Sequence, residues 1–321
     1  MGTLLEVRNL KKYFQVPKGY LHAVDDVSFK INEGETLGIV GESGCGKSTL
    51  GRAILRLHEP TSGTVLYDGM NVTGMDKQEM RALRKYMQII FQDPYASLNP
   101  RFTVAQIIEE PLRLHKIYSS EAEVHARVEE LMDMVGLSAR MQNAYPHEFD
   151  GGRRQRIVIA RALAVGPKFI VCDEPVSALD VSIQAQILNL MIDLQKELNL
   201  TYIFISHNLS VVKHISTDVG VMYLGQLIEK APKRMIYKNP LHPYTIALLA
   251  AIPSLDPEAK RERQILKGEL TSPVNPKRGC RFSTRCPFAQ DRCFTDNPVM
   301  REVEPGHFVA CHRVLGKEGI Q

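Results

Sequence analysis

The stretch Gly41-Glu-Ser-Gly-Cys-Gly-Lys-Ser-Thr49 decides the fold, because it matches the pattern GxxxxGK[S/T] of a phosphate-binding loop. The apolar run TLGIVG before it predicts a short buried strand, and a helix is expected from Ser48 to about Leu57. A glycine-rich turn could match by chance, but strand, loop and helix agree here. We therefore expect nine loop residues to contact a nucleotide: Gly41, Glu42, Ser43, Gly44, Cys45, Gly46, Lys47, Ser48 and Thr49.

This loop offers three means of holding phosphate. Its glycines let backbone N–H groups approach the phosphate oxygens, and the N-terminus of the following helix adds a partial positive charge. Lys47 is expected to reach the outer phosphates, and the hydroxyl of Ser48 is expected to bind Mg²⁺. The sequence therefore predicts a site for ATP and Mg²⁺ on this loop.

A second apolar run ends in two carboxylates, at Phe169-Ile-Val-Cys-Asp173-Glu174. Ligands of open α/β sheets lie at the carboxyl ends of the strands, so both acids are expected at the ligand-binding edge. Asp173 is placed to hold Mg²⁺ through water, and Glu174 to orient or deprotonate the attacking water. Alone, a strand ending in two solvated acids would be the simpler interpretation. After a phosphate-binding loop, the catalytic interpretation is favoured.

The composition is ordinary for a globular protein, with 44% hydrophobic and 24% charged residues in a chain of 321. A net charge of +4 is too small to indicate nucleic-acid binding by itself, although it suits a protein beside an anionic membrane surface. No apolar run reaches the ~18–20 residues that span a bilayer, and the N-terminus lacks the long apolar stretch of a secretory signal. We expect a cytoplasmic protein whose membrane role is peripheral.

Further motifs, in the expected order, resemble those of ABC ATPases. Phe149-Asp-Gly-Gly-Arg153, followed by RQRIVIARAL, resembles the signature motif of that family. The resemblance implies that Tyr13 stacks on adenine, that Gln92 senses Mg²⁺ and contacts the membrane partner, and that His207 is the switch residue at the γ-phosphate. Ser177-Ala-Leu-Asp180 matches the loop across the dimer interface. Taken singly, Tyr13 could be an ordinary strand aromatic, and Gln92 and His207 polar residues at strand ends.

The same resemblance implies the fold class: α/β, with a P-loop NTPase (RecA-like) core, an antiparallel β subdomain, a helical subdomain and a small Cys-containing C-terminal module. Strands alternating with helices also predict a parallel sheet. The segment NEGE at 32–35 predicts a hairpin turn, and charged sequence from Lys77 to about Leu137 predicts a helical insertion. We place the ABC ATPase domain at 1–231, its helical subdomain at about 77–155, and the C-terminal module at 232–321.

Four segments look like the oligopeptide and dipeptide importers of this family: FQDPYASLNPR, YPHEF, DEPVSALDVSIQAQILNL and NPLHPYTIALLAAIPSLDP. This resemblance implies ATP hydrolysis that powers peptide import at the cytoplasmic face of the cell membrane. It also implies a second ATPase subunit, two transmembrane permease subunits and an extracytoplasmic peptide-binding protein as partners, and no nucleic acid. The rival interpretation is a soluble ABC ATPase that acts on nucleic acid or ribosomes. Those proteins commonly fuse two cassettes or insert a long coiled coil, and the sequence has neither.

One motif departs from the family pattern Ser-Gly-Gly-Gln, because Asp150 and Arg153 flank Gly151 and Gly152. An ionised Asp150 cannot donate a hydrogen bond to the γ-phosphate, and its charge would repel that group. Arg153 could offset the charge from one helical turn away, and aspartate is also a strong helix N-cap. We expect Gly151 and Gly152 to donate backbone hydrogen bonds to ATP. If Asp150 weakens the ATP site that it faces, the native assembly is expected to be a heterodimer with two unequal ATP sites. The sequence leaves a homodimer as the alternative.

Four of the six cysteines crowd the end of the chain, at Cys280, Cys286, Cys293 and Cys311. In a reducing cytosol such a group favours metal binding over disulfides. The C-x-x-C pair typical of structural zinc is missing, and looser spacing with a Cys-Pro pair suits an iron–sulfur cluster. Some peptide-importer ATPases carry a [4Fe–4S] cluster on such a tail, so the resemblance implies one here. Zinc and metal-free thiols stay open as alternatives.

Other polar residues of this tail are expected at the surface. His307 and His312 could bind zinc, but surface positions are the simpler interpretation. We interpret the arginines as a solvated basic face that balances an anionic thiolate cluster, in preference to a nucleic-acid site: Arg278, Arg281, Arg285 and Arg292.

Overall fold

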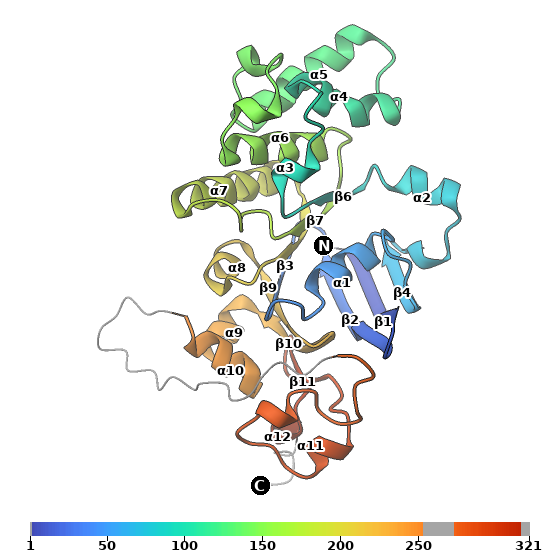
Figure 1. The fold of residues 1–321 in the computed structure, drawn as a ribbon, viewed down its shortest axis with the longest axis vertical. Helices are drawn as coiled ribbons and strands as arrows, with labels where there is room; N and C mark the ends of the chain where they lie inside the picture. Colours follow the sequence, from blue (N-terminus) through green and yellow to red (C-terminus); the bar gives the residue numbers. More distant parts are fainter. Residues whose placement is uncertain (1, 253–272, 316–321) are drawn as a thin grey trace. The chain divides into compact units, whose positions relative to one another are not determined.

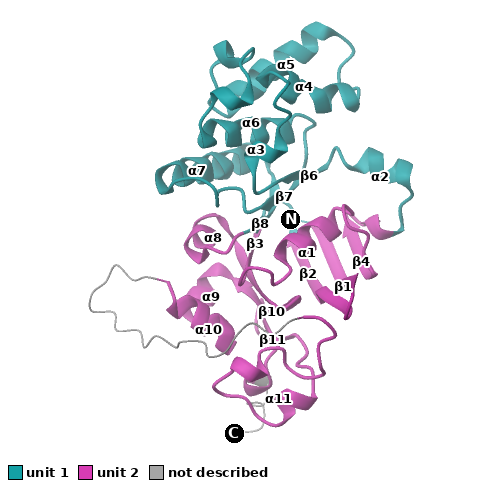
Figure 2. Ribbon diagram, viewed as in Figure 1, with its two compact units in different colours: residues 1–2, 32–35, 74–205 teal, residues 3–31, 36–73, 206–321 magenta. Residues whose placement is uncertain are grey.

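A computed structural model describes residues 2–252 and 273–315 (Figure 1). Two parts of the predicted C-terminal module, 253–272 and 316–321, lie outside the described residues. The chain divides into two compact units (Figure 2). Unit 1 comprises residues 1–2, 32–35 and 74–205, and unit 2 comprises residues 3–31, 36–73 and 206–321.

Unit 1 combines three parallel strands with a group of helices. Its elements are α2 (Lys77–Leu83), β6 (Met87–Ile90), α3 (Pro94–Ser97), α4 (Val104–Leu114), α5 (Glu121–Met134), the 3₁₀ turns η2 (Ala139–Met141) and η3 (Pro146–Glu148), α6 (Gly151–Leu163), β7 (Phe169–Asp173), α7 (Val181–Leu198) and β8 (Thr201–Ile205). Strand β7 pairs in parallel with β6 on one side and β8 on the other. Every residue of β7 and β8 is buried, as their unbroken apolar runs predict for strands covered on both faces.

The helices of unit 1 begin where the sequence supplies caps. The side chains of Asp76, Thr103 and Ser120 accept hydrogen bonds from backbone amides at the starts of α2, α4 and α5, each within a capping box. Strand β6 lies inside the stretch that the charged sequence predicts as helical. Its residues MQII form a short apolar run that completes the parallel sheet, so tertiary pairing overrides the charged surroundings.

Unit 2 contains the phosphate-binding loop, the strands that precede it in the chain and several strands that follow it. Its elements are β1 (Thr3–Val16), β2 (Gly19–Asn32), β3 (Thr36–Val40), α1 (Lys47–Ile54), β4 (Ser62–Tyr67), β5 (Met70–Asn71), η1 (Val72–Gly74), α8 (Leu209–Ile215), β9 (Asp218–Tyr223), β10 (Gln226–Pro232), α9 (Lys233–Lys238), α10 (Pro243–Ala250), η4 (Ser283–Arg285), α11 (Arg292–Thr295), β11 (Arg301–Glu304), β12 (His307–Val309) and α12 (His312–Leu315).

Two sheets organise these strands. One has the order β2-β1-β4-β5, with antiparallel pairing of β4 to β1 and β5, and matches the predicted antiparallel subdomain. In the other, β3 pairs in parallel with β9, and β9, β10, β12 and β11 follow in antiparallel order. The predicted hairpin at 32–35 is wrong, because β2 and β3 belong to different sheets. Within the described residues, no helix is both long and apolar enough to cross a membrane.

Candidate functional site

The phosphate-binding loop of unit 2 runs from the end of β3 into α1, which begins at Lys47. Two loop glycines are required by backbone conformation and by close neighbours. Gly46 has φ 104°, and a Cβ there would lie 1.9 Å from the carbonyl oxygen of Ala23. Gly41 has φ 152°, and a Cβ there would lie 2.2 Å from the carbonyl oxygen of Met222. Backbone atoms cannot turn aside as side chains do, so both positions need glycine.

Lys47 lies at the centre of the loop and is 5% exposed. Its Nζ donates to the carbonyl oxygens of Gly41, at 2.9 Å, and Glu42, at 3.0 Å. The loop therefore curls around the ammonium group, which satisfies its donors as burial demands. Burial raises the pKa of the Cys45 thiol, so the nearest sulfur stays neutral beside the ammonium. An ammonium group among amide N–H groups at a helix N-terminus can bind a phosphate.

Four further residues of the loop are at least partly exposed. Ser43 and Gly44 are exposed at the tip of the loop, and Ser48 and Thr49 lie half-buried in the first turn of α1. Hydroxyl oxygens are ligands that suit Mg²⁺. The loop therefore offers the donor chemistry that a magnesium-bound nucleotide needs.

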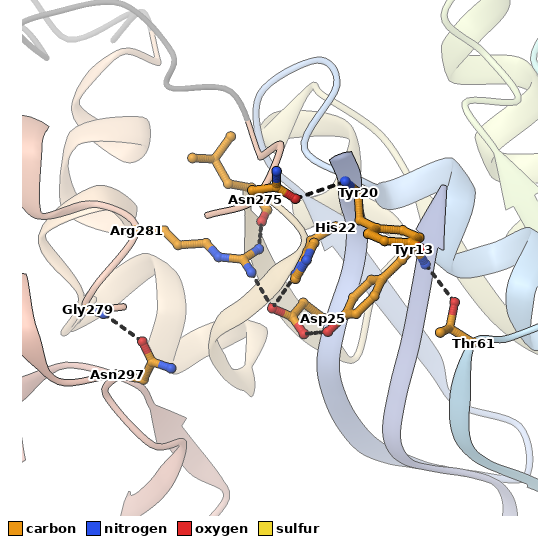
Figure 3. A network of polar contacts seen from close by, with 10 residues as sticks. Tyr13, Tyr20, His22, Asp25, Thr61, Asn275, Gly279, Arg281 and Asn297 are labelled. Atoms are coloured by element: carbon orange, nitrogen blue, oxygen red, sulfur yellow. Dashed lines mark hydrogen bonds and ion pairs between the residues drawn. The ribbon is translucent and has the colours of Figure 1, made fainter. Parts of the chain in front are cut away.

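Tyr13 of β1 lies in a polar network of unit 2 (Figure 3). Its ring stacks on that of His22 from β2, with centroids 3.8 Å apart and planes at 19°. Its hydroxyl donates to the carboxylate of Asp25, and its backbone N–H donates to Oγ1 of Thr61 at 2.9 Å. Burial raises the pKa of Tyr13, which keeps the hydroxyl protonated as the donor. With His22 on one face, the ring has at most one face for a nucleotide base.

His207 lies in an exposed turn of unit 2, directly before α8. The turn is fixed by its neighbour Asn208, whose side chain caps α8 by accepting from the amides of Ser210, at 2.9 Å, and Val211, at 3.4 Å. The backbone N–H of Asn208 donates to Oγ of Ser206 at 3.0 Å. The backbone on both sides of His207, the residue that the sequence predicts as a switch, is therefore held by hydrogen bonds.

Unit 1 brings Gln92 and Glu174 together. Asp173 ends β7 and is 2% exposed, and Glu174 follows it with φ 51°, which a residue other than glycine rarely adopts. Nε2 of Gln92 donates to Oε2 of Glu174 at 3.0 Å. The backbone N–H of Glu174 donates to the carbonyl oxygen of Ile205 at 3.0 Å. Such uncommon backbone conformations gather at functional sites, and the hydrogen bond from Gln92 orients the carboxylate.

The N-terminal ends of α6 and α7 lie side by side in unit 1. A Cβ on Gly152 would lie 2.6 Å from Cγ2 of Ile183, and one on Gly151 would lie 2.9 Å from Cδ2 of Leu179. Asp180 caps α7, accepting from the amide of Ile183 at 3.0 Å. The predicted signature motif and the predicted interface loop are thus brought together, and packing alone already favours both glycines.

Asp150 caps α6, with its Oδ1 accepting from the amide of Arg153 at 2.8 Å. The Arg153 guanidinium lies 3.6 Å from the other carboxylate oxygen, in an ion pair more than half exposed on both sides. The structure thus contains both features that the sequence allows: Asp150 caps the helix, and Arg153 lies close enough to offset its charge. An exposed pair of this kind contributes little to stability, so the cap is the larger effect.

Comparisons with known proteins show the family of this chain. The family described as "ABC transporter" matches residues 24–177, and the one described as "Oligopeptide/dipeptide transporter, C-terminal region" matches residues 228–293. The putative oligopeptide transport ATP-binding protein YkfD of Bacillus subtilis is 56% identical over 312 residues, covering 96% of this chain and 95% of YkfD. The chain belongs to the ABC transporter ATP-binding proteins.

Further relatives of this ABC protein extend the comparison. The oligopeptide transport ATP-binding protein AppF of Bacillus subtilis is 54% identical over 320 residues, covering 97% of both chains. A solved ATP-binding cassette, MJ0796, in a post-hydrolysis dimer bound to ADP and phosphate, superposes with a TM-score of 0.66 at 30% identity, covering 72% of this chain and 99% of the cassette. The predicted family, the ABC ATPase fold and the ATPase class are confirmed.

The [4Fe–4S] cluster predicted on Cys280, Cys286, Cys293 and Cys311 of this ABC ATPase is wrong. In residues 2–252 and 273–315, no three His, Cys, Asp or Glu side chains are grouped so that they could hold a metal ion. The four cysteines line one cavity of about 20 Å³, room for about one water molecule. The zinc alternative meets the same obstacle.

Two tail arginines of this ABC protein have largely buried side chains, although the sequence predicts a solvated basic face. The side chains of Arg281 and Arg285 are 7% and 8% exposed, and each pairs with a carboxylate. Their partners lie 256 and 243 residues earlier in the chain, so no local pattern could have found them. His307 is also buried rather than at the surface, because its Nε2 lies 2.7 Å from Oε1 of the buried Glu229.

Proposed function

We propose that this chain is the ATP-hydrolysing subunit of a transporter that imports dipeptides or oligopeptides across the cytoplasmic membrane. One observation carries the proposal: relatives named as oligopeptide transport ATP-binding proteins are 54–56% identical over nearly their whole length. The match at residues 228–293 to a C-terminal region specific to such transporters supports a peptide rather than another cargo. Residues 232–321 are accordingly proposed as the peptide-importer module, after an ATPase domain at 1–231.

The phosphate-binding loop and Lys47 are proposed to hold the outer phosphates of ATP, with Tyr13 against the adenine. Charge-assisted hydrogen bonds from Lys47 and the loop amides fit those phosphates. Ser48 and Asp173 are each proposed as ligands of Mg²⁺, because both carry oxygen atoms of the kind that this ion prefers. When bound there, Mg²⁺ would neutralise phosphate charge and favour attack at the γ-phosphate.

Glu174 is proposed as the base that takes a proton from the attacking water. The hydrogen bond from Gln92 supports this role, because it orients the carboxylate. His207 is proposed to contact the γ-phosphate from its exposed turn. Gly151 and Gly152 of one subunit are proposed to donate backbone hydrogen bonds to ATP held by the other, with Asp180 beside them.

The proposed assembly has two ATPase subunits, two transmembrane permease subunits and an extracytoplasmic peptide-binding protein. This chain would lie at the cytoplasmic face of the membrane, where dimer closure and reopening drive the permeases. Asp150 supports a heterodimer, because a carboxylate in place of a hydroxyl would make the ATP site that it faces weaker than its counterpart.

Uptake of a radiolabelled tripeptide tests the proposed function. Cells that lack this chain should lose uptake, regain it with the wild-type chain, and fail to regain it with Lys47→Ala. The chain, purified from membranes, should bring permease subunits with it. Normal peptide uptake without the chain, or copurification with ribosomes or RNA in place of permeases, would contradict the proposal.

A further inference from the structure

A short part of the C-terminal region, residues 279–286, lies against the phosphate-binding loop within unit 2. Phe282 anchors it, being 1% exposed, with its ring edge-on to those of Tyr223 at 5.3 Å and Tyr244 at 5.4 Å between centroids. Arg281 and Arg285, on either side of this anchor, both point to groups that support the loop. A segment far along the sequence thus becomes part of the support of the nucleotide site.

Arg285 holds the second residue of the loop, Glu42, by its carboxylate. Its Nη1 donates to Oε2 at 2.9 Å and its Nη2 to Oε1 at 3.2 Å, the two-point geometry for which guanidinium is suited. The backbone N–H of Glu42 donates to the hydroxyl oxygen of Tyr244 at 3.0 Å. The carbonyl oxygen of Glu42 accepts from Lys47. Arg285 therefore fixes a residue that in turn positions the lysine expected to bind phosphate.

Arg281 supports the other end of the loop through a turn. Its guanidinium donates to the carbonyl oxygen of Leu224 and to the carboxylate of Asp25. The next residue, Gly225, donates its N–H to the carbonyl oxygen of Cys45 in the loop at 2.8 Å. The carbonyl oxygen of Gly225 accepts from the amide of Asp25 at 2.8 Å. Arg281 thus holds the turn against which the loop rests.

Asp25 extends this support to the proposed adenine contact (Figure 3). Its carboxylate accepts hydrogen bonds from both Arg281 and the hydroxyl of Tyr13. Burial by itself raises the pKa of Asp25, but hydrogen bonds from Tyr13, and the charge of Arg281, hold that pKa below its usual range. Asp25 therefore stays ionised, and one arginine orients both the loop and the aromatic ring.

We propose that Arg281 and Arg285 are positioning residues for ATP, and that the C-terminal region sets nucleotide affinity through them. They act through Glu42, the turn at Leu224, and Asp25. The side chains of Arg281 and Arg285 are 7% and 8% exposed and their partner carboxylates are partly buried, so solvent and salt screen these ion pairs less than pairs at the open surface. The inference rests on the proposed role of the loop in binding ATP.

The test measures the Kd of the full-length chain for mant-ATP, a fluorescent ATP, together with urea unfolding of the nucleotide-free protein. Arg285→Gln should raise the Kd about 5-fold or more, the usual size of a coupling between sites. Arg285→Lys should fall between wild type and Arg285→Gln, because lysine keeps the charge and loses the two-point contact. Arg281→Lys should likewise raise the Kd above that of the wild type. Arg278→Gln, at an exposed arginine of the same tail, is the matched control and should leave the Kd unchanged.

A double-mutant cycle with Glu42→Gln separates positioning from general loss of structure. If Arg285 acts through Glu42, the double variant should bind mant-ATP no more weakly than Arg285→Gln alone. Additive losses, or an unchanged Kd in folded Arg285→Gln, would overturn the inference. Should Arg285→Gln not fold, Arg285→Lys decides: an unchanged Kd rejects the role. A wild-type chain that does not bind mant-ATP would instead reject the proposed nucleotide site.

Discussion

Two glycines of the phosphate-binding loop give a matched pair of alanine substitutions whose costs follow from the structure. At Gly44, φ is 76° and no atom lies within 4 Å of the place that a Cβ would take, so Gly44→Ala meets only backbone strain. That strain amounts to about 1–2 kcal/mol. At Gly46, φ is 104° and the new Cβ would lie 1.9 Å from the carbonyl oxygen of Ala23. Overpacking adds about 1–3 kcal/mol, so Gly46→Ala should cost roughly 2–5 kcal/mol.

Urea unfolding followed by circular dichroism measures both costs. The two variants can be compared directly, because neither substitution alters the charge of the chain. Gly46→Ala should have the lower midpoint by a clear margin, and should also lose mant-ATP binding because the loop must move away from Ala23. Gly44→Ala should stay folded and lose only part of its stability. Equal midpoints for the two variants would refute the close packing of the loop against β2.

The other predictions concern helix capping and pH. Asp150→Ala should lower the free energy of unfolding by about 1 kcal/mol, measured in urea, because α6 loses its cap. Asp150→Ser keeps a cap and should raise ATP turnover in a forced homodimer; lower turnover would count against charge repulsion. Burial raises the pKa of Glu229, but hydrogen bonds from His307 and from the amides of Leu241 and His242 outweigh it, so the net pKa is lowered. The ionised carboxylate therefore stabilises the fold above the ordinary carboxyl pKa of ~4.3, and this contribution is lost as pH falls through the lowered pKa. Urea midpoints measured from pH 6 to pH 3 should fall less steeply in Glu229→Gln, and identical slopes would disagree with this assignment.

The parts of the site that the sequence predicted are those made by contiguous residues. Strand β3, the loop at Gly41–Thr49 and α1 follow one another in the chain, so a local pattern carries their geometry. Asp173 and Glu174 end a buried strand for the same reason. Periodicity and turn chemistry could not assign strand partners. Strand β3 follows a turn-like segment, yet it pairs in parallel with β9 from far along the chain.

The role of the tail depended on contacts that no local pattern encodes. Arginines in a Pro-rich segment are usually solvated, and only the burial of Phe282 between two tyrosine rings brings Arg281 and Arg285 to their carboxylates. For the four tail cysteines, the local pattern predicted a metal site that the structure does not support. Their number and spacing favoured a cluster, but spacing does not fix how sulfur atoms are grouped in space, and these line a cavity of about 20 Å³.

ATP turnover by Glu174→Gln, assayed with the permease and partner ATPase subunits present, tests the proposed hydrolytic role most directly. The variant should bind ATP as the wild type does, because Lys47 and the loop are untouched. Its turnover should fall by about 10²-fold or more, the loss expected when a positioned base is removed. An ATP-bound dimer should then accumulate. Turnover close to that of the wild type would contradict the assignment of Glu174 as the base.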